Sequence, residues 1–596
     1  MLSILHKNWI VFLLLSCFLS TSNYNFFSQN WAWTTSGGGP KSDKANAIVT
    51  DNEGYSYITG YYNEEAIFGT YSFPLVNEHS KEVFIAKVDP NGNYVWVKNG
   101  LNYYDDRGLG ICLDPQGNVY VTGTCWGGIE FGSLYETNGS GFTDQIFLVK
   151  LDNDGNFIWL KNVGNDAGDD HGLNLASDKE GNIYLTGFVS AWSFGCSGPG
   201  VATFGGLSIN LGACDSLAFI AKITNDGNWQ WVRSFPGIVG ENDNRIEVDT
   251  ASNVYVVGGF MGTKTFGTTT LTSYGGQDIY VVKYDKDGNF IYAKSTGSPL
   301  DDRANDLCID NKNYLYICGE FRDRLDFGGD SLNNNGGPNG RDIFVAKMTP
   351  QGNWIWASKA GSNYGTDKAC GITVNSNYNV FVTGQFKGDA YFSDDIPLTS
   401  PFPDSVQIFV AAIDSSGVWK WAVQAGGTDD DDRGNGIDCD AHCNIYVCGF
   451  FTGTGTFGTY TENGQMKEAF FGRFSSVCFE NEQIEEPEEP IIYPPPTAEI
   501  IDSSFYMFIP NAFSPNDDEL NQTFKPIITT SLRFVNYSLT VYDRWGELLF
   551  ESHNPDVGWD GTFNTTQLQS GVYTWKLSYS NDLNQEKKSG FVYLKK

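Results

Sequence analysis

The sequence predicts an all-β protein: a seven-bladed β-propeller with four-stranded blades, followed by a C-terminal Ig-like β-sandwich. Three observations predict it. Glycine accounts for 68 of the 596 residues and aromatic residues for 15%, which is typical of short strands joined by tight turns. A four-strand pattern recurs seven times along residues 31–478. Residues 501–596 show a separate alternation of apolar and polar side chains, as in Ser538–Tyr542.

A short aromatic strand marks each copy of the repeat. It recurs at intervals of about 61–72 residues, as Trp31–Trp33, Tyr94–Trp96, Phe157–Trp159, Trp229–Trp231, Phe290–Tyr292, Trp354–Trp356 and Trp419–Trp421. Between two marks lie an acidic turn with an apolar strand, a strand of the type Asn-x-Tyr-x-x-Gly, a Phe-Gly pair, and a strand ending in a cation. Four antiparallel strands per copy are the unit of a propeller blade.

The two ends of the array predict how the ring closes. The first aromatic strand, Trp31–Trp33, has no other strands of a copy before it. The last copy, from Ile437 to Arg473, has no aromatic strand of its own. We therefore expect the N-terminal strand to complete the last blade, which removes the open edges that an unclosed array would expose.

These units resemble the bacterial β-propeller family of SBBP repeats. Typical of that family are Asp-x-x-x-x-Ile, Gly-Asn-x-Tyr-Val-Thr-Gly (here Gly117–Gly123) and Asp-x-Phe-Val-Ala-Lys (compare Phe344–Lys347). The resemblance covers residues 31–478. It implies the fold but not an activity, because one fold hosts many functions.

The first 22 residues are predicted to be a secretory signal peptide. Lys7 precedes an apolar run from Trp9 to Leu19, which is too short for a stable membrane anchor and is followed by polar residues. A lipoprotein signal ending at Cys17 is the alternative. No other stretch reaches about 18 apolar residues, so no transmembrane span is expected in the mature chain.

The charge balance argues against two classes of partner. Lys and Arg total 38 against 71 Asp and Glu, which gives a net charge of −33, and no basic cluster is visible in the sequence. Nucleic acids and anionic lipids both require clustered Lys and Arg. Neither is therefore an expected partner.

The candidate binding surface is the propeller face that carries the connections from the second to the third strand of each blade. These connections are long, about 20–31 residues, and vary in length, although neutral drift of surface loops would give the same variation. One aspartate per blade shares this face and is a candidate for ligand binding: Asp43, Asp106, Asp170, Asp243, Asp302, Asp367 and Asp432. A ring of carboxylates binds cations such as Ca²⁺. The alternative is that each aspartate accepts backbone hydrogen bonds in a turn, and the Lys, Arg or His that follows most of them would quench the field of such a ring.

Enzyme motifs are scarce. The five His are scattered, and there is no metal-binding His pair, nucleophile elbow or phosphate loop. We predict no catalytic residue, no metal site and no cofactor, with calcium left open. Cys196 and Cys214 lie in the longest connection and form a candidate disulfide, since an exported protein permits one. Two further pairs, Cys308 with Cys318 and Cys439 with Cys448, are either cross-strand disulfides or buried thiols.

Two segments follow the propeller. Residues 479–500 are rich in Glu and Pro and are predicted to be an extended linker. Residues 501–596 resemble the gliding-motility-associated C-terminal domain, the type B sorting domain of the type IX secretion system in Bacteroidota. The motif residues are Pro510, Asn511, Phe513, Pro515, Asn516, Asp543, Arg544, Trp545, Gly546, Trp559, Asp560, Gly561, Gly571 and Tyr573. The loop Asn516–Gln522 lacks the family's glycines and final Asp, which puts an ion-binding role of that loop in doubt. A generic Ig-like binding module is the alternative.

Together these features predict a secreted or surface-displayed protein that the type IX secretion machinery exports. The propeller would be its passenger, a binding or adhesion platform for an extracellular glycan or protein. The alternatives are an extracellular hydrolase or lyase acting on polysaccharide from the loop-rich face, and a structural component of a surface layer.

Overall fold

The structure is a computed structural model that describes two parts of the chain. The first is residues 30–475, except 76–77, 79, 138–142, 192–197, 238–243, 329, 337–339, 364, 401–403 and 429–430. The second is residues 507–595, except 511, 514, 516–522, 529–535, 544–546, 556, 565 and 581–584. The predicted signal peptide (1–22) and linker (479–500) lie outside the described residues. The chain divides into two compact units, residues 1–486 and 487–596.

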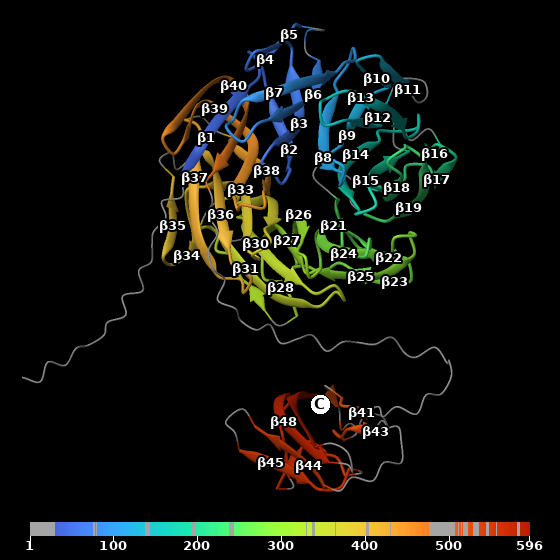
Figure 1. Cartoon of the computed structure of the whole chain (residues 1–596), viewed down its shortest axis with the longest axis vertical. Coiled ribbons are helices and arrows are strands. Elements are labelled where there is room, and N and C mark those ends of the chain that lie inside the picture. Colours follow the sequence, from blue (N-terminus) through green and yellow to red (C-terminus); the bar gives the residue numbers. More distant parts are fainter. Residues whose placement is uncertain are drawn as a thin grey trace, which may run out of the picture. The chain divides into compact units, whose positions relative to one another are not determined.

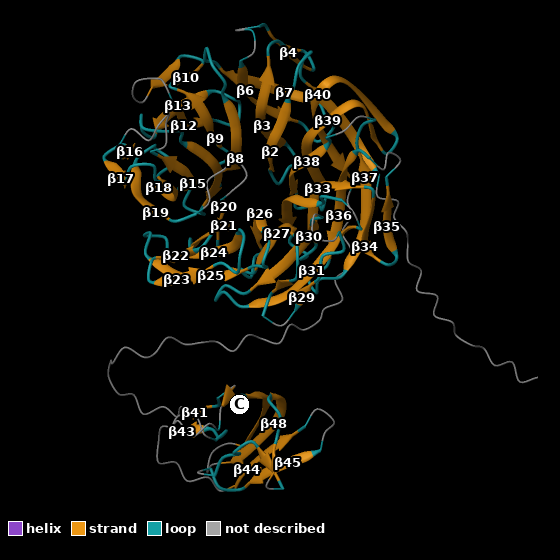
Figure 2. Ribbon diagram, turned by 180° about the vertical axis from the view of Figure 1, so that it is seen from behind, coloured by secondary structure: helices purple, strands orange, loops and turns teal. Residues whose placement is uncertain are grey.

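The first unit is all-β and propeller-like, because four-stranded antiparallel sheets repeat along it and stand around a common centre (Figures 1 and 2). In each sheet the strands follow one another in the order A, B, C, D, with strand A nearest the centre. The fifth sheet has six strands, because a two-stranded hairpin from the next repeat pairs with its strand D. The A strands are β2 (Lys44–Thr50), β8 (Arg107–Leu113), β14 (His171–Ser177), β20 (Arg245–Val248), β26 (Arg303–Ile309), β32 (Lys368–Val374) and β38 (Arg433–Cys439). The B strands are β3 (Ser56–Asn63), β9 (Val119–Trp126), β15 (Ile183–Ser190), β21 (Val254–Phe260), β27 (Leu315–Phe321), β33 (Val380–Lys387) and β39 (Ile445–Phe457).

The C strands carry the repeated cation and the D strands the repeated aromatic pair. The C strands are β6 (Lys81–Val88), β12 (Asp144–Leu151), β18 (Ser216–Ile223), β24 (Asp278–Tyr284), β30 (Asp342–Met348), β36 (Val406–Ile413) and β40 (Tyr460–Phe474). The D strands are β7 (Tyr94–Gly100), β13 (Phe157–Val163), β19 (Trp229–Phe235), β25 (Phe290–Thr296), β31 (Trp354–Ser362), β37 (Trp419–Ala425) and β1 (Trp31–Gly37). Each D strand begins at the aromatic residue that the sequence analysis used as a mark.

The N-terminal strand β1 completes the last sheet, whose order is β1-β40-β39-β38. Trp31 pairs with Phe474 and Trp33 with Arg473, with an irregularity between the two pairs. Phe157 and Trp159 pair with Leu151 and Lys150 in the same register and with the same irregularity. The pairing of β1 with β40 that the sequence predicts is thus present, in the register of an ordinary D strand.

The long connections between strands B and C differ from the expected loops, because six of them fold into small hairpins. These are β4 (Ala66–Phe68) with β5 (Tyr71–Phe73), β10 (Gly128–Phe131) with β11 (Leu134–Thr137), β16 (Gly200–Phe204) with β17 (Leu207–Leu211), β22 (Thr263–Phe266) with β23 (Thr269–Thr272), β28 (Leu325–Asp326) with β29 (Ser331–Leu332), and β34 (Asp389–Ser393) with β35 (Ile396–Thr399). In the last sheet β39 and β40 instead run on as one long hairpin.

The Phe-Gly pairs sit at the tips of these hairpins and explain why the connections have structure. Phe204 is fully buried, while Gly205 turns the chain with φ +60°, a conformation that favours glycine. The Phe204 ring meets the first aromatic of its own D strand, Trp229, edge-to-face at 5.3 Å. Much of each connection is therefore fixed by packing.

The second aromatic of each D strand links neighbouring sheets. The Trp96 indole N–H donates to the carbonyl of Asn153, in the C–D turn of the next sheet, at 3.1 Å. In that turn Gly155 has φ +81°, and a Cβ on it would lie 2.8 Å from the Trp96 ring. Equivalent links run from Trp33 to Pro90, Trp159 to Asn225, Trp231 to Lys286, Tyr292 to Pro350 and Trp356 to Ser415.

The sixth sheet departs from this pattern because of how the ring closes. Its neighbour, the last sheet, takes strand D from the N-terminus and so has no C–D turn to accept a hydrogen bond. The buried indole N–H of Trp421 accordingly has no partner among the residues that the structure describes. The cation that other sheets carry on strand C is Ala412 here.

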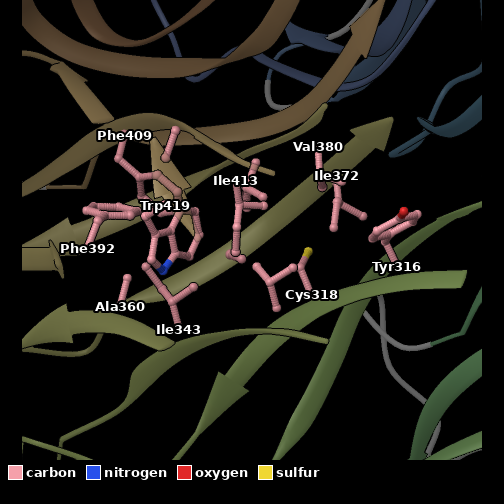
Figure 3. Close-up of a cluster of buried hydrophobic side chains, with 14 of the residues drawn as sticks. Tyr316, Cys318, Ile343, Ala360, Ile372, Val380, Phe392, Phe409, Ile413 and Trp419 are labelled. Carbon is pink, nitrogen blue, oxygen red and sulfur yellow. The ribbon is translucent and has the colours of Figure 1, made fainter. Parts of the chain in front are cut away.

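The apolar core lies between successive sheets. Figure 3 shows one such cluster, in which Ile343 of one sheet packs with Phe409 and Trp419 of the next. The Phe392 ring of hairpin β34–β35 meets Trp419 edge-to-face at 4.9 Å. Because strands B and C carry near-continuous runs of buried residues, both faces of each sheet are covered.

The second unit is also all-β in its described part. A five-stranded sheet has the order β42 (Ala512–Phe513), β49 (Gln585–Leu594), β48 (Gly571–Ser580), β44 (Asn536–Tyr542), β45 (Leu548–Ser552), and β42 runs parallel to β49. Two short pairs accompany it: β41 (Met507–Phe508) with β43 (Ile527–Ile528), and β46 (Thr562–Phe563) with β47 (Thr566–Gln567). Its core centres on Trp559, which is fully buried.

Candidate functional site

Six of the seven predicted aspartates are fully buried. They are Asp43, Asp106, Asp170, Asp302, Asp367 and Asp432, each 0% exposed. The Asp43 carboxylate accepts the backbone N–H of Gly39 at 2.6 Å and that of Asn63, twenty residues further on, at 2.8 Å. Equivalent pairs of backbone amides hold Asp170, Asp302, Asp367 and Asp432.

These carboxylates tie one sheet to the next. Gly39 follows strand D of the preceding sheet, and Asn63 ends strand B of the sheet that follows Asp43. Burial raises the pKa of Asp43 to about 7, while the two backbone hydrogen bonds act in the opposite direction. The geometry therefore matches the alternative of a turn-capping aspartate. Ligand binding by this set stays a prediction that the geometry does not favour, because the oxygens face backbone amides.

Asp243 lies outside the described residues. The strand register of its sheet shows which sequence position corresponds to the other six aspartates. In the other sheets the tethering aspartate stands eight residues before the residue that opens the A–B turn, as Asp170 stands before Asp178. The corresponding turn residue in the fourth sheet is Asp249, and eight residues before it is Glu241. Pairing of Arg245 with Val257 fixes this register. By this register Asp243 is not the position equivalent to the other six aspartates, and its own role in ligand binding stays a prediction.

Basic residues at the start of the A strands gather at the centre of the ring; Lys44, Arg107, Lys368 and Arg433 directly follow one of these aspartates, whereas Arg245 does not. Five of them line one cavity of about 150 Å³: Lys44, Arg107, Arg245, Lys368 and Arg433. Each is the first residue of its A strand. In the sequence these cations are visible only as a counter-charge to the aspartates. They form no basic cluster there because they are widely spaced in the chain and come together only when the ring forms.

Neutral groups position several of these cations. The Lys44 ammonium lies 4.4 Å from the centre of the Phe450 ring, and the Arg107 guanidinium 6.0 Å from that of Tyr61. The Arg433 Nε–H donates to the Gln385 side-chain oxygen at 2.6 Å. In all three cases the partner belongs to the preceding sheet. Arg107 also lies 3.7 Å from the carboxylate of Asp105.

A second cavity of about 280 Å³ adjoins the first and shares Arg245 with it. It contains three carboxylates from three A strands: Glu247, Asp306 and Asp438. Burial, and then the negative charges of Asp306 and Asp438, raise the pKa of Glu247 to about 8. Burial raises the pKa of Asp306 and of Asp438 to about 6. At neutral pH the Glu247 carboxyl is therefore mostly protonated, whereas Asp306 and Asp438 stay mostly charged, so this cavity keeps part of its negative charge.

The cysteines divide into bonded and free. Cys214 is disulfide-bonded, as is Cys443, which the sequence analysis did not single out. Cys196 lies outside the described residues. Cys308, Cys318, Cys439 and Cys448 are free thiols, so of the two alternatives for these pairs the thiols are present. Cys308 pairs across the sheet with Tyr316 and not with Cys318.

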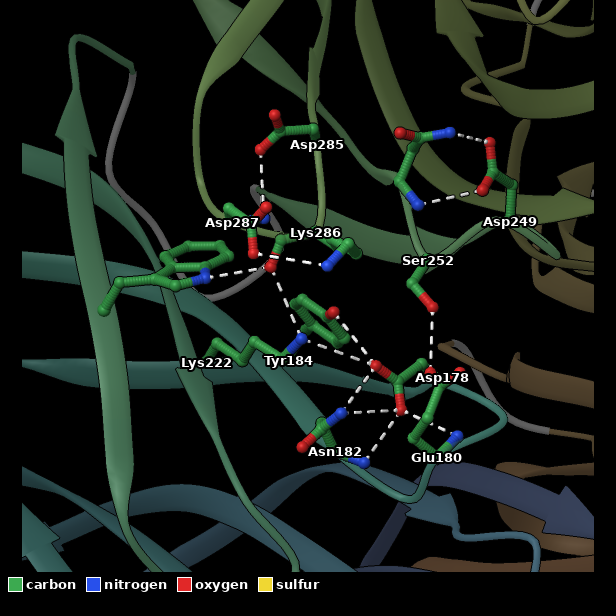
Figure 4. Close-up of polar contacts among 12 residues, drawn as sticks. Asp178, Glu180, Asn182, Tyr184, Lys222, Asp249, Ser252, Asp285, Lys286 and Asp287 are labelled. Atoms are coloured by element: carbon green, nitrogen blue, oxygen red, sulfur yellow. Dashed lines mark hydrogen bonds and ion pairs between the residues drawn. The ribbon is translucent and has the colours of Figure 1, made fainter.

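A repeated Asp–Tyr–Lys unit occupies the opposite ends of the strands, at the A–B turns (Figure 4). Asp178 accepts the backbone N–H of Glu180 at 3.1 Å, that of Asn182 at 2.8 Å and the Tyr184 hydroxyl at 3.1 Å. The Lys222 ammonium lies 3.6 Å from the Asp178 carboxylate and 4.8 Å from the Tyr184 ring centre. The sixth sheet replaces all three residues together, with Asn375, Phe381 and Ala412.

Because all three residues are replaced together, we predict that the contributions of Asp178 and Lys222 to the free energy of unfolding depend on each other. We expect Asp178→Asn to lower the free energy of unfolding by about 1–3 kcal/mol, because Lys222 loses its charge partner while the turn amides keep an acceptor. Asn375 shows that asparagine still accepts two turn amides, at 3.0 and 2.9 Å. A double-mutant cycle with Lys222→Ala, followed by urea denaturation, should give a coupling energy of about 1 kcal/mol or more.

Asp285→Asn is the matched control. Asp285 caps a C–D turn through the N–H groups of Asp287 and Asn289 at 3.0 and 2.8 Å, and no Tyr hydroxyl from the described part of the chain reaches its carboxylate. Its replacement should change stability by no more than about 0.5 kcal/mol. Equal losses for Asp178→Asn and Asp285→Asn would show that the Tyr and Lys partners contribute nothing.

The predicted sorting-motif residues of the second unit play two structural roles. Phe513 and Trp559 are buried, and Tyr573 meets Trp559 edge-to-face at 4.9 Å. Gly561 has φ +78° beside Leu594. Asp543 and Asp560 cap local turns through Glu547 N–H and Thr562 N–H at 2.8 and 3.0 Å, and Asp560 is exposed. Pro510, Pro515 and Gly571 are half-buried, while Asn511, Asn516, Arg544, Trp545 and Gly546 lie outside the described residues.

The described residues show neither a metal-binding cluster nor a membrane-spanning helix. None of their His, Cys, Asp and Glu side chains gather in groups of three or more that could hold a metal ion. The described part of the chain also contains no helix with the length and apolar character needed to cross a membrane. In the C–D turn Asp152–Gly155, the Asp152 carboxylate accepts the N–H groups of Asp154 and Asn156 at 3.0 and 2.8 Å.

Comparison with known proteins identifies the second unit. Residues 507–594 match the family model described as the CHU_C type IX secretion signal domain. An uncharacterized WD repeat-containing protein, L264, from Acanthamoeba polyphaga mimivirus is 24% identical over 46% of this chain. The matched region spans about a quarter of that relative, 24% of its length. WD repeats form four-stranded propeller blades.

Two solved structures are also similar. One is a mutant of a puromycin hydrolase complexed with PGG, at 8% identity and a TM-score of 0.37, with 71% of this chain and 55% of that chain covered. The other is PorZ of Porphyromonas gingivalis, a bacterial surface component of the type IX secretion system, at 9% identity and a TM-score of 0.22, covering 94% and 100%.

Proposed function

We propose that this protein is a cargo of the type IX secretion system, and that its first unit is an extracellular binding or adhesion module. The observation that carries the proposal is the match of residues 507–594 to a type IX secretion signal domain, which implies export to the surface or the medium and contact with the secretion machinery. That signal occupies the second compact unit, residues 487–596, so the remaining unit is the passenger.

We also infer that the passenger is a seven-bladed propeller of SBBP-type repeats and that the second unit is an Ig-like sandwich. Support for the ring comes from β1, which occupies the place of a D strand in the sheet of β38, β39 and β40. Support for binding comes from the centre of the ring, where polar side chains from several sheets line a cavity. A passenger of this kind presents a rigid platform for a ligand.

Fusion of residues 487–596 to an unrelated protein tests the export assignment. A reporter that carries a signal peptide and this unit at its C-terminus should reach the cell surface or the medium of a host with a type IX system. The same fusion with Trp559→Ala should stay in the periplasm, because Trp559 is fully buried at the centre of this unit. Export of neither fusion, with both intact in the periplasm, would contradict the assignment.

A further inference from the structure

The centre of the ring concentrates positive charge in an acidic protein. The chain has a net charge of −33, yet Lys44, Arg107, Arg245, Lys368 and Arg433 line one cavity, and no acidic residue of the described part of the chain lines it with them. All five are half-buried. Like charges held together repel one another, more strongly where the surroundings exclude water. A fold that assembles five such residues from five strands stabilises a negative group placed among them.

Two of the cations, Lys368 and Arg433, keep a charge that no ion pair with a carboxylate of the described residues compensates, and Arg433 is positioned by the uncharged Gln385. The charge of Arg245 is offset in part, because Arg245 acts to lower the pKa of Asp306 in the adjoining cavity. Two arginine side chains beside one lysine supply planar donor pairs and a point charge, a set that suits the oxygens of a phosphate or sulfate group.

The basic residues are not explained by a structural role in neutralising the carboxylates of the adjoining cavity. Glu247, Asp306 and Asp438 line the adjoining cavity, and of the five basic residues only Arg245 lines that cavity too. Backbone N–H groups already serve two of these carboxylates: Thr50 donates to Asp438 at 2.7 Å and Ile372 to Asp306 at 3.0 Å. Lys368 and Arg433 are therefore left for another anion.

We propose that this basic cavity binds an oxyanion group, a phosphate or sulfate, either free or carried as a substituent of a larger extracellular molecule. The cavity volume of about 150 Å³ suits a group of that size. The proposal names the ligand class for the binding module of the proposed function and rests on that part of it. Export is tested separately by the fusion above, so failure of one leaves the other standing.

Binding by the purified chain that begins at residue 23 tests the proposal. The probes are inorganic sulfate, inorganic phosphate, dextran sulfate, uncharged dextran and poly-glutamate, measured by calorimetry at low ionic strength. We expect binding of at least one phosphate or sulfate probe and none of uncharged dextran. Binding of the inorganic ions identifies a free oxyanion as sufficient, whereas binding of dextran sulfate alone identifies a polymer substituent.

Lys368→Gln is the informative variant, because the Lys368 side chain has no hydrogen bond or ion pair among the described residues and its loss removes charge without removing an internal contact. The matched control is Lys264→Gln, on the exposed hairpin strand β22. We expect Lys368→Gln to weaken binding by about threefold or more, with the control unchanged and both variants unfolding at the wild-type urea concentration. Arg433→Gln should weaken binding in the same direction.

Three results would overturn the proposal. The first is no binding of any phosphate or sulfate probe by the wild-type chain. The second is equal binding by the Lys368→Gln and Lys264→Gln variants. The third is binding of poly-glutamate with no binding of sulfate or phosphate, which would identify a carboxylate-bearing peptide as the ligand.

Discussion

Removal of residues 507–596 is expected to leave the protein in the periplasm. The deleted segment contains the whole region that matches a type IX secretion signal domain, residues 507–594. The remaining unit keeps its own core, because the two compact units are separate in their internal contacts. We therefore expect the first unit to fold but to lack its secretion signal. Immunoblots of cell fractions should show the extracellular fraction of the protein reduced by about tenfold or more.

A point substitution tests whether export requires the signal unit to be folded, because it keeps the segment in the chain but disrupts its core. Trp559 donates its indole N–H to the Thr562 carbonyl at 2.9 Å and packs against Phe513 at 5.3 Å. Trp559→Ala should cost about 3–5 kcal/mol and so unfold or loosen this unit. Val572→Ser, at a residue that is 58% exposed, is the control and should leave export unchanged. Normal export of the truncated chain would show that the signal lies elsewhere.

Loss of the N-terminal strand β1 is expected to open the ring. Trp31 is 5% exposed and contacts three aromatic rings of the last sheet: Phe457, Phe470 and Phe474, at 5.2, 6.3 and 4.2 Å. Trp31→Ala should lower the free energy of unfolding by about 3–5 kcal/mol. A chain that starts at residue 39 should lose more, because β40 then becomes an unpaired edge strand that invites association between copies.

The measurement compares chains that start at residue 30 and at residue 39. Urea denaturation should show a lower midpoint for the shorter chain, and size-exclusion chromatography should show its association. A peptide of residues 30–38 added in trans should restore part of the stability, whereas a scrambled peptide of the same composition should not. An unchanged midpoint for the shorter chain would mean that β1 does not contribute to closure.

Most of the strand order of the first unit is encoded locally. Each D strand begins at the aromatic residue that marks its copy, and turn glycines such as Gly155 occupy left-handed positions that their place in the repeat predicts. Even the closing strand follows from a count, since Trp31–Trp33 has no partner strands of its own. The sequence likewise determines the second unit as a signal domain, because its motifs occur in order within a short segment.

The tertiary structure decided which charges are available to a ligand. Asp43 and Lys44 are neighbours in the chain, and their types alone do not show that one carboxylate is buried on backbone amides while the next ammonium lines the central cavity. The hairpins between strands B and C were missed because their buried Phe residues pack on a distant D strand. The replacement of the strand-C cation by Ala412 is likewise explained only by the ring. The sheet that follows Ala412 is the last one, and it has no C–D turn that could accept a hydrogen bond from a cation at this position.

The physical reason for this division is the range of the interactions. Turn conformation and strand alternation depend on neighbouring residues, so the sequence alone determined the strands, the repeat and the C-terminal signal. Burial and clustering of charge depend on residues that closure of the ring brings together from separate sheets, as it brings Lys44 to Arg433. Only the tertiary structure could therefore distinguish the tethering aspartates from the basic cavity beside them.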